Sequence, residues 1–162
     1  MLISEEAVRK MTGKSLPFAK AAMLIRKPIS EVFDAFIDPE ITTKIWFTKS
    51  SSRLYIGETI SWTWELFDHT VEIFVKSIVT DERIQIQWGE NKDALVNWDF
   101  KKMDDSGTFV TITNTGFVGT SDDLIAQIRD TTEGFTLVLA NLKALLEQGV
   151  LLDLVTDRYP KV

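Results

Sequence analysis

The sequence contains no cysteine and a single histidine. Without cysteine it has no disulfides, no thiolate metal ligands and no cysteine nucleophile, a composition typical of a reducing cytoplasm. His69 falls in a predicted turn between Asp68 and Thr70, where an exposed turn residue is expected rather than a general base. With no second histidine we predict no metal site, no cofactor and no catalytic residue.

Basic residues and long apolar runs are also scarce. The chain has 18 Lys and Arg against 24 Asp and Glu, which gives a formal charge of -6 and disfavours a nucleic-acid partner. No segment approaches the ~20 apolar residues of a membrane span, and the opening MLISEEAVRK carries acids where a signal peptide needs basic residues. Phosphate loops, nucleophile elbows and dinucleotide fingerprints are absent. We therefore expect a soluble cytoplasmic protein.

What is present fits one domain over residues 1–162. An accessory helix is predicted within residues 1–14, beginning near Ser4 and ending at Gly13, followed by a core at 18–149 and a tail at 150–162 without clear periodicity.

The first part of the core predicts a strand at 18–25 and two short helices. Pro28, reinforced by Ser30 and Glu31, begins the first helix, and Asp38-Pro39 ends it and begins the second. One apolar stripe of the first helix should face the core: Val32, Phe33, Phe36 and Ile37.

A period of two then predicts five strands with one buried face. The inward positions are Ile60, Trp62, Trp64 and Leu66, then Val71, Ile73 and Val75, then Ile84, Ile86 and Trp88, then Ala94, Val96, Trp98 and Phe100, then Val110 and Ile112. Short turn-rich connections indicate an antiparallel meander.

The period changes again after Gly119. Ser121 with Asp122 and Asp123 predicts a helix start, and an apolar stripe continues to a stop at Gly149. Gly134 is the expected place of a bend or a division into two helices.

Three local patterns carry a family resemblance. They are PISEVFDAF at 28–36 leading to Asp38-Pro39-Glu40 and Trp46, Gly57-Glu58 before the tryptophan strand, and Gly134-Phe135 with Leu139, Leu142-Lys143 and Leu146-Glu147. With these patterns, residues 18–149 resemble the START-like, or SRPBCC, superfamily, and most closely its branch related to the activator of the ninety-kilodalton heat-shock chaperone's ATPase. The resemblance implies an α+β helix-grip fold, in which a curved antiparallel sheet wraps a long C-terminal helix.

The chain departs from that branch at two positions and at its start. The branch commonly has tryptophan where Phe135 stands and a second glycine where Glu58 stands, and the N-terminal helix is not a general family feature. The resemblance implies apolar ligand binding between sheet and helix, with protein contacts or cyclisation and dehydration in some members. Fold alone does not choose among these uses.

Five tryptophans are the residues most suggestive of a site. Core packing is the more common role of any one ring, but as a set on a concave sheet they favour a cavity with indole N–H donors. We predict that a small apolar or aromatic ligand contacts Phe33, Phe36, Trp46, Trp62, Trp64, Trp88, Trp98, Phe100, Phe135 and Leu139.

Two alternatives remain open at this point. An interaction module would bind a chaperone or a second copy of the chain, and a cyclase or dehydratase would need a titratable residue inside the cavity. Alternation places Glu65, Glu72 and Asp99 on the solvent face. Four polar residues near strand ends would reach a ligand only if a bulge shifts the register: Asn97, Thr111, Thr113 and Asn114.

Overall fold

The computed structural model describes residue 6 and residues 16–89 and 93–161. The predicted helix within residues 1–14 lies outside these residues, apart from Glu6. In chain order the elements are β1 (Ala19–Ile25), α2 (Ile29–Ile37), α3 (Pro39–Ile45), β2 (Lys49–Ser50), β3 (Thr59–Trp64), β4 (His69–Val79), β5 (Arg83–Trp88), β6 (Ala94–Met103), β7 (Gly107–Thr115), α4 (Ser121–Gln148) and α5 (Leu154–Asp157).

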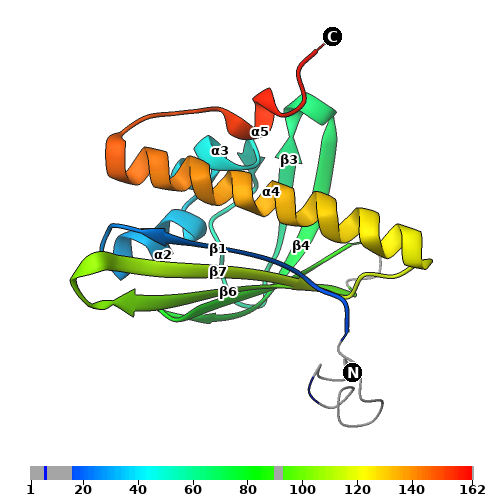
Figure 1. Cartoon of the computed structure of the whole chain (residues 1–162), viewed down its shortest axis with the longest axis horizontal. Coiled ribbons are helices and arrows are strands. Elements are labelled where there is room, and N and C mark those ends of the chain that lie inside the picture. The colour runs from blue at the N-terminus through cyan, green and yellow to red at the C-terminus, as the bar shows by residue number, and fades with distance from the viewer. Residues whose placement is uncertain (1–5, 7–15, 90–92, 162) are drawn as a thin grey trace.

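The strands form one antiparallel sheet of seven strands in the order β1-β7-β6-β5-β4-β3-β2. Consecutive neighbours from β3 to β7 confirm the predicted meander, and β1 extends the sheet by pairing with β7. Figure 1 shows α4 lying across the sheet, with β3 and β4 rising behind it and β1, β7 and β6 below. The α+β fold with a curved sheet around a long helix is therefore as predicted.

The inward face of the sheet follows the period of two. Its buried members are Ile60, Trp62, Ile73, Val75, Ile84, Ile86, Val96, Trp98, Phe100, Val110 and Ile112. Burial of each such side chain stabilises the fold by about 1.5–3 kcal/mol. On the outer face Asp99 pairs with Arg83 at 3.0 Å, and Glu65 beyond β3 pairs with Lys49 at 3.2 Å. Asp99 and the exposed Glu72 therefore lie on the solvent face of the sheet, as alternation predicts, whereas Glu65 is exposed in the turn after β3.

The two short helices begin at the residues that the sequence indicates. Pro28 is the N-cap of α2, and Asp38 caps α3 by accepting a hydrogen bond from the Glu40 amide at 3.0 Å. The buried stripe of α2 includes Phe33 and Phe36, which lie against β6 through Phe100.

The turn between β3 and β4 differs from the prediction. β3 ends at Trp64, and Glu65–Phe67 forms a 3₁₀ turn that includes Leu66. His69 is consequently the first residue of β4 and lies opposite Trp64 in the antiparallel register. Leucine at position 66 continues the alternating pattern beyond the point where the chain reverses.

α4 is one continuous helix of 28 residues, about 42 Å long at about 1.5 Å per residue. Its cap is Thr120, which forms a reciprocal capping box with Asp123, rather than Ser121. The helix passes through Gly134 without division, so the predicted alternative of two separate helices is wrong. It ends where expected, at Gly149 in the left-handed conformation.

The tail contains a short helix that the sequence pattern misses. α5 is anchored by the buried Asn141 of α4, whose Nδ2 donates to the carbonyl oxygen of Ile45 at 3.0 Å. The Leu154 amide donates to the Asn141 Oδ1 at 3.2 Å. One buried amide thus joins α3, α4 and α5.

Candidate ligand cavity

The middle of the space between sheet and helix is filled by aromatic rings. Trp46 lies in their centre, with ring centroids 4.9 Å from Trp62, 5.6 Å from Phe135 and 6.0 Å from Trp98. Phe47 stacks on Trp62 at 4.4 Å. Trp98 is buried, and its indole N–H has no acceptor among the described residues. These rings contact one another and form the core at this position.

A cavity of about 560 Å³, widely open to solvent, lies beside this core, at the end of the sheet under the N-terminal half of α4. We call it the aromatic cavity. It is formed by the β3–β4 turn, the end of β5 with Gly89, the start of β6, the chain after β7 and the first turns of α4. Its lining residues are Trp64, Phe67, His69, Val71, Trp88, Gly89, Ala94, Asn114, Gly116, Phe117, Gln127, Asp130 and Thr131.

The structure divides the ten predicted site residues between core and cavity. Trp64 and Trp88 line the aromatic cavity. Trp46 is partly buried behind them, 6.1 Å from each ring. The other seven are at most 7% exposed and belong to the core: Phe33, Phe36, Trp62, Trp98, Phe100, Phe135 and Leu139.

Several lining residues were not among the predicted ones. Asn114 continues the inward alternation of Val110 and Ile112 without any bulge, so the strand pattern contained the signal for it. Phe67 and His69 belong to the β3–β4 connection, where the turn begins about two residues earlier than the sequence pattern predicts. The remaining lining residues follow no sequence period, because distant segments meet only in the folded chain.

Charge and burial vary with depth in the aromatic cavity. His69 and Asp130 are the ionisable side chains among the described lining residues, and both are exposed at the rim. Asp130 pairs with Arg129 at 3.3 Å. Asn114 is only 1% exposed and forms part of the inner wall. The inner part is therefore apolar and aromatic, with a buried amide.

Two lining amides are oriented by backbone carbonyls. Asn114 Nδ2 donates to the Thr115 carbonyl oxygen at 3.0 Å. Gln127 Nε2 donates to the carbonyl oxygens of Val118 at 3.0 Å and Asp123 at 3.1 Å. Because a carbonyl oxygen only accepts, these contacts identify the NH₂ end of each amide.

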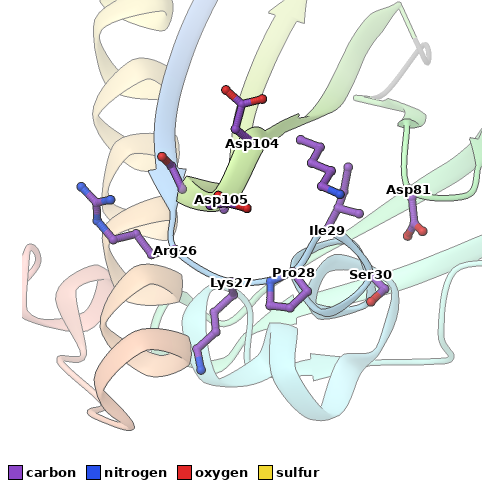
Figure 2. A pocket seen from close by; sticks show the side chains of 11 residues that line it. Arg26, Lys27, Pro28, Ile29, Ser30, Asp81, Asp104 and Asp105 are labelled. Carbon is purple, nitrogen blue, oxygen red and sulfur yellow. The ribbon is translucent and has the colours of Figure 1, made fainter.

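A second hollow of about 500 Å³ lies at the opposite end of the sheet, between the start of α2 and the β6–β7 turn. Figure 2 shows Arg26, Lys27 and Asp104 spreading away from one another rather than converging on a centre. Its walls contain charges of both signs and no aromatic ring. The aromatic cavity is therefore the better candidate for an apolar ligand.

The described residues contain neither a metal-binding cluster nor a membrane-spanning helix. In that part of the chain no group of three or more His, Asp and Glu side chains is placed to hold a metal ion. No helix there is long and apolar enough to cross a membrane.

Solved structures share this architecture. Protein SSP2350 from Staphylococcus saprophyticus is 30% identical over 83% of this chain and 95% of its own, with a TM-score of 0.72. MLL2253 from Mesorhizobium loti is 15% identical over 83% of this chain and 99% of its own, with a TM-score of 0.70. The Aha1 dimer from Colwellia psychrerythraea is 17% identical over 82% of this chain and 97% of its own, with a TM-score of 0.71.

No curated protein matches this sequence. The family model described as "Activator of Hsp90 ATPase homolog 1-like protein" matches residues 26–147, from the end of β1 to the last turn of α4. This segment includes the sheet from β2 to β7, the two short helices and nearly all of α4. The chain therefore belongs to the activator of Hsp90 ATPase homolog 1-like family.

Proposed function

We propose that this protein binds a small apolar or aromatic molecule in the aromatic cavity. The observation that carries the proposal is a space of about 560 Å³ beside a filled core, lined by Trp64, Trp88 and Phe117. This volume lies within the range of roughly 300–1,000 Å³ that is usual for small-molecule sites. Such sites combine apolar walls with a few placed polar groups, as here.

The position of the ionisable residues favours binding over catalysis. A cyclase or dehydratase needs an acid or base beside the reacting atoms. The ionisable lining residues that are described, His69 and Asp130, are at the exposed rim, while the inner wall offers rings and amides. We therefore assign binding rather than catalysis to the aromatic cavity.

A cavity-filling substitution tests the proposal. Ala94 lines the cavity on the inward face of β6, so Ala94→Phe places a ring in the space that a ligand needs. Ala22→Phe is the matched control, because Ala22 is exposed on β1 away from the cavity. Saturation-transfer NMR with uncharged naphthalene derivatives should show binding to the unsubstituted chain and to Ala22→Phe, and loss with Ala94→Phe. Equal binding to all three proteins would contradict the proposal.

Self-association is a second candidate function. Three consecutive apolar side chains after α4 are exposed: Val150 at 43%, Leu151 at 54% and Leu152 at 44%. Apolar surface of this kind favours a protein contact when it is contiguous. Sedimentation velocity should show a dimer that dissociates with Leu151→Glu; a monomer at all concentrations would exclude it. Chaperone binding remains a prediction from family membership, tested by co-sedimentation with purified Hsp90.

A further inference from the structure

The polar groups of the aromatic cavity restrict the chemical class of ligand that it can bind. This inference rests on the proposed function. Both lining amides have their NH₂ groups engaged by backbone carbonyl oxygens. Asn114 Oδ1 and Gln127 Oε1 accept no hydrogen bond from any residue that the structure describes. A ligand therefore meets hydrogen-bond acceptors at these two residues.

Asn114 is the more informative of the two because it is buried. The side chain is 1% exposed and makes one hydrogen bond among the described residues, from Nδ2 to the Thr115 carbonyl oxygen. A ligand that covers this oxygen without donating a hydrogen bond leaves the acceptor unpaired, which is unfavourable by about 1–3 kcal/mol. A ligand that supplies a hydroxyl or N–H group at this position avoids that cost.

The charges of the cavity argue against an anionic ligand. No lysine or arginine is among its described lining residues, so a carboxylate or phosphate has no cation to pair with there. Asp130 adds a negative charge at the rim, and the chain has a net charge of -6. Because Arg129 already pairs with Asp130, the carboxylate does not require a cationic ligand either.

We infer that the ligand is an uncharged planar aromatic molecule bearing a hydroxyl or N–H group, whose hydrogen is accepted by Asn114 Oδ1. The rings of Trp64, Trp88 and Phe117 supply flat apolar contacts, and Asn114 supplies specificity at the inner wall. An analogue that lacks the donor leaves Oδ1 unpaired and binds more weakly.

Three matched probes test this inference by calorimetric titration at neutral pH. They are naphthol, its methyl ether and naphthoate, all substituted at the same ring carbon. Naphthol donates a hydrogen bond, the ether only accepts, and naphthoate is an anion. Naphthol should bind about tenfold more tightly than the ether, the ratio expected for one hydrogen bond of about 1.4 kcal/mol. Naphthoate should bind at least tenfold more weakly than naphthol.

Two asparagine variants locate the effect. Asn114→Leu should bind naphthol and the ether equally, because it removes the acceptor at nearly constant volume. Asn97→Leu is the matched control on the outer face of β6, and should retain the difference. If Asn114→Leu does not fold, the comparison of naphthol with its methyl ether on the unsubstituted chain still tests whether tight binding requires a hydrogen-bond donor.

The outcomes separate this inference from the proposed function. Equal binding of naphthol and the ether, or a preference that persists in Asn114→Leu, overturns the role of Asn114 but leaves a ligand-binding cavity. Naphthoate binding as tightly as naphthol overturns the exclusion of anions. Binding of no probe contradicts the proposed function, and the inference falls with it.

Discussion

The two halves of α4 lie over the same sheet but differ in what separates helix from sheet. In the C-terminal half Val138, Leu139 and Leu142 are fully buried, and the helix packs against β1. In the N-terminal half no residue before Phe135 is buried, and Gln127 and Asp130 border the aromatic cavity. One half stabilises the fold and the other leaves room for a ligand.

The cause of this difference is visible in the composition of the helix. The segment at 138–146 (VLANLKALL) supplies large aliphatic side chains at core spacing, whereas the segment at 127–133 (QIRDTTE) is mostly polar. A polar helix face cannot fill the concave end of the sheet with apolar groups. Residual space therefore lies where the apolar stripe of the helix is weakest.

The largest effect is expected from shortening a buried side chain in the C-terminal half. Leu139 is fully buried, so Leu139→Ala should lower the free energy of unfolding by about 2–5 kcal/mol. Leu124→Ala makes the same change in the partly exposed N-terminal half, and should have a clearly smaller effect. Urea denaturation measures both variants. Equal losses of unfolding free energy in the two variants would contradict the proposed difference in packing between the two halves of α4.

A second loss is expected where Asn141 joins three helices. Asn141→Leu removes the partners of the Ile45 carbonyl oxygen and the Leu154 amide. Leaving these groups unpaired should destabilise the fold by about 1–3 kcal/mol. Hydrogen exchange should also show faster exchange of the Leu154 amide. Unchanged exchange would show that α5 does not depend on this bond.

A smaller, pH-dependent effect is expected at Glu147, whose side chain is 12% exposed. Burial is the largest influence on its pKa and raises it, but hydrogen bonds from the Arg26 amide and the Lys143 ammonium outweigh burial, so the pKa is lowered. The carboxylate contacts these groups at 2.9 Å and 2.6 Å, and Lys143 also donates to the Leu24 carbonyl oxygen at 2.8 Å.

A carboxylate with a lowered folded-state pKa stabilises the fold above the unfolded-state pKa and loses this contribution as pH falls through the folded-state pKa. Glu147→Gln should therefore reduce stability on the order of 1 kcal/mol at neutral pH, with the difference vanishing in acid. Denaturation curves across acidic pH measure this difference. A difference that is constant with pH would contradict the ion-pair explanation.

The smallest expected effect lies at the boundary between the halves. Gly134 has helical neighbours, and a Cβ added there meets no atom within 4 Å. Gly134→Ala should therefore stabilise the fold by about 0.5–1 kcal/mol. A lower thermal midpoint would instead show that Gly134 is required in α4 for another reason.

Local patterns in the sequence were sufficient to predict most of the fold. The tryptophan-bearing strands, the caps at Pro28 and Asp38 and the stop at Gly149 are encoded within a few residues. β2 and α5 are too short to show a period. The reversal after Trp64 was misplaced because Leu66 continues the apolar alternation into a turn.

The cavity was harder to predict than the fold. Alternation identifies which tryptophans point inward, but not which of them are enclosed in the core and which border the cavity. Trp98 and Trp64 both point inward, yet Trp98 is packed in the core and Trp64 lines the cavity. That distinction depends on Trp46 and Phe135, which reach the same place from distant parts of the chain.

The most direct test of this account is to map a bound probe on the two halves of α4. Proton–nitrogen correlation spectra recorded during titration with naphthol should show shifted amides at residues 127–131, together with Trp88 and Asn114 at the cavity. The amides of the buried C-terminal half at 138–146 should remain unchanged. Shifts confined to that half, or to residues 26–30 beside the second hollow, would contradict the account.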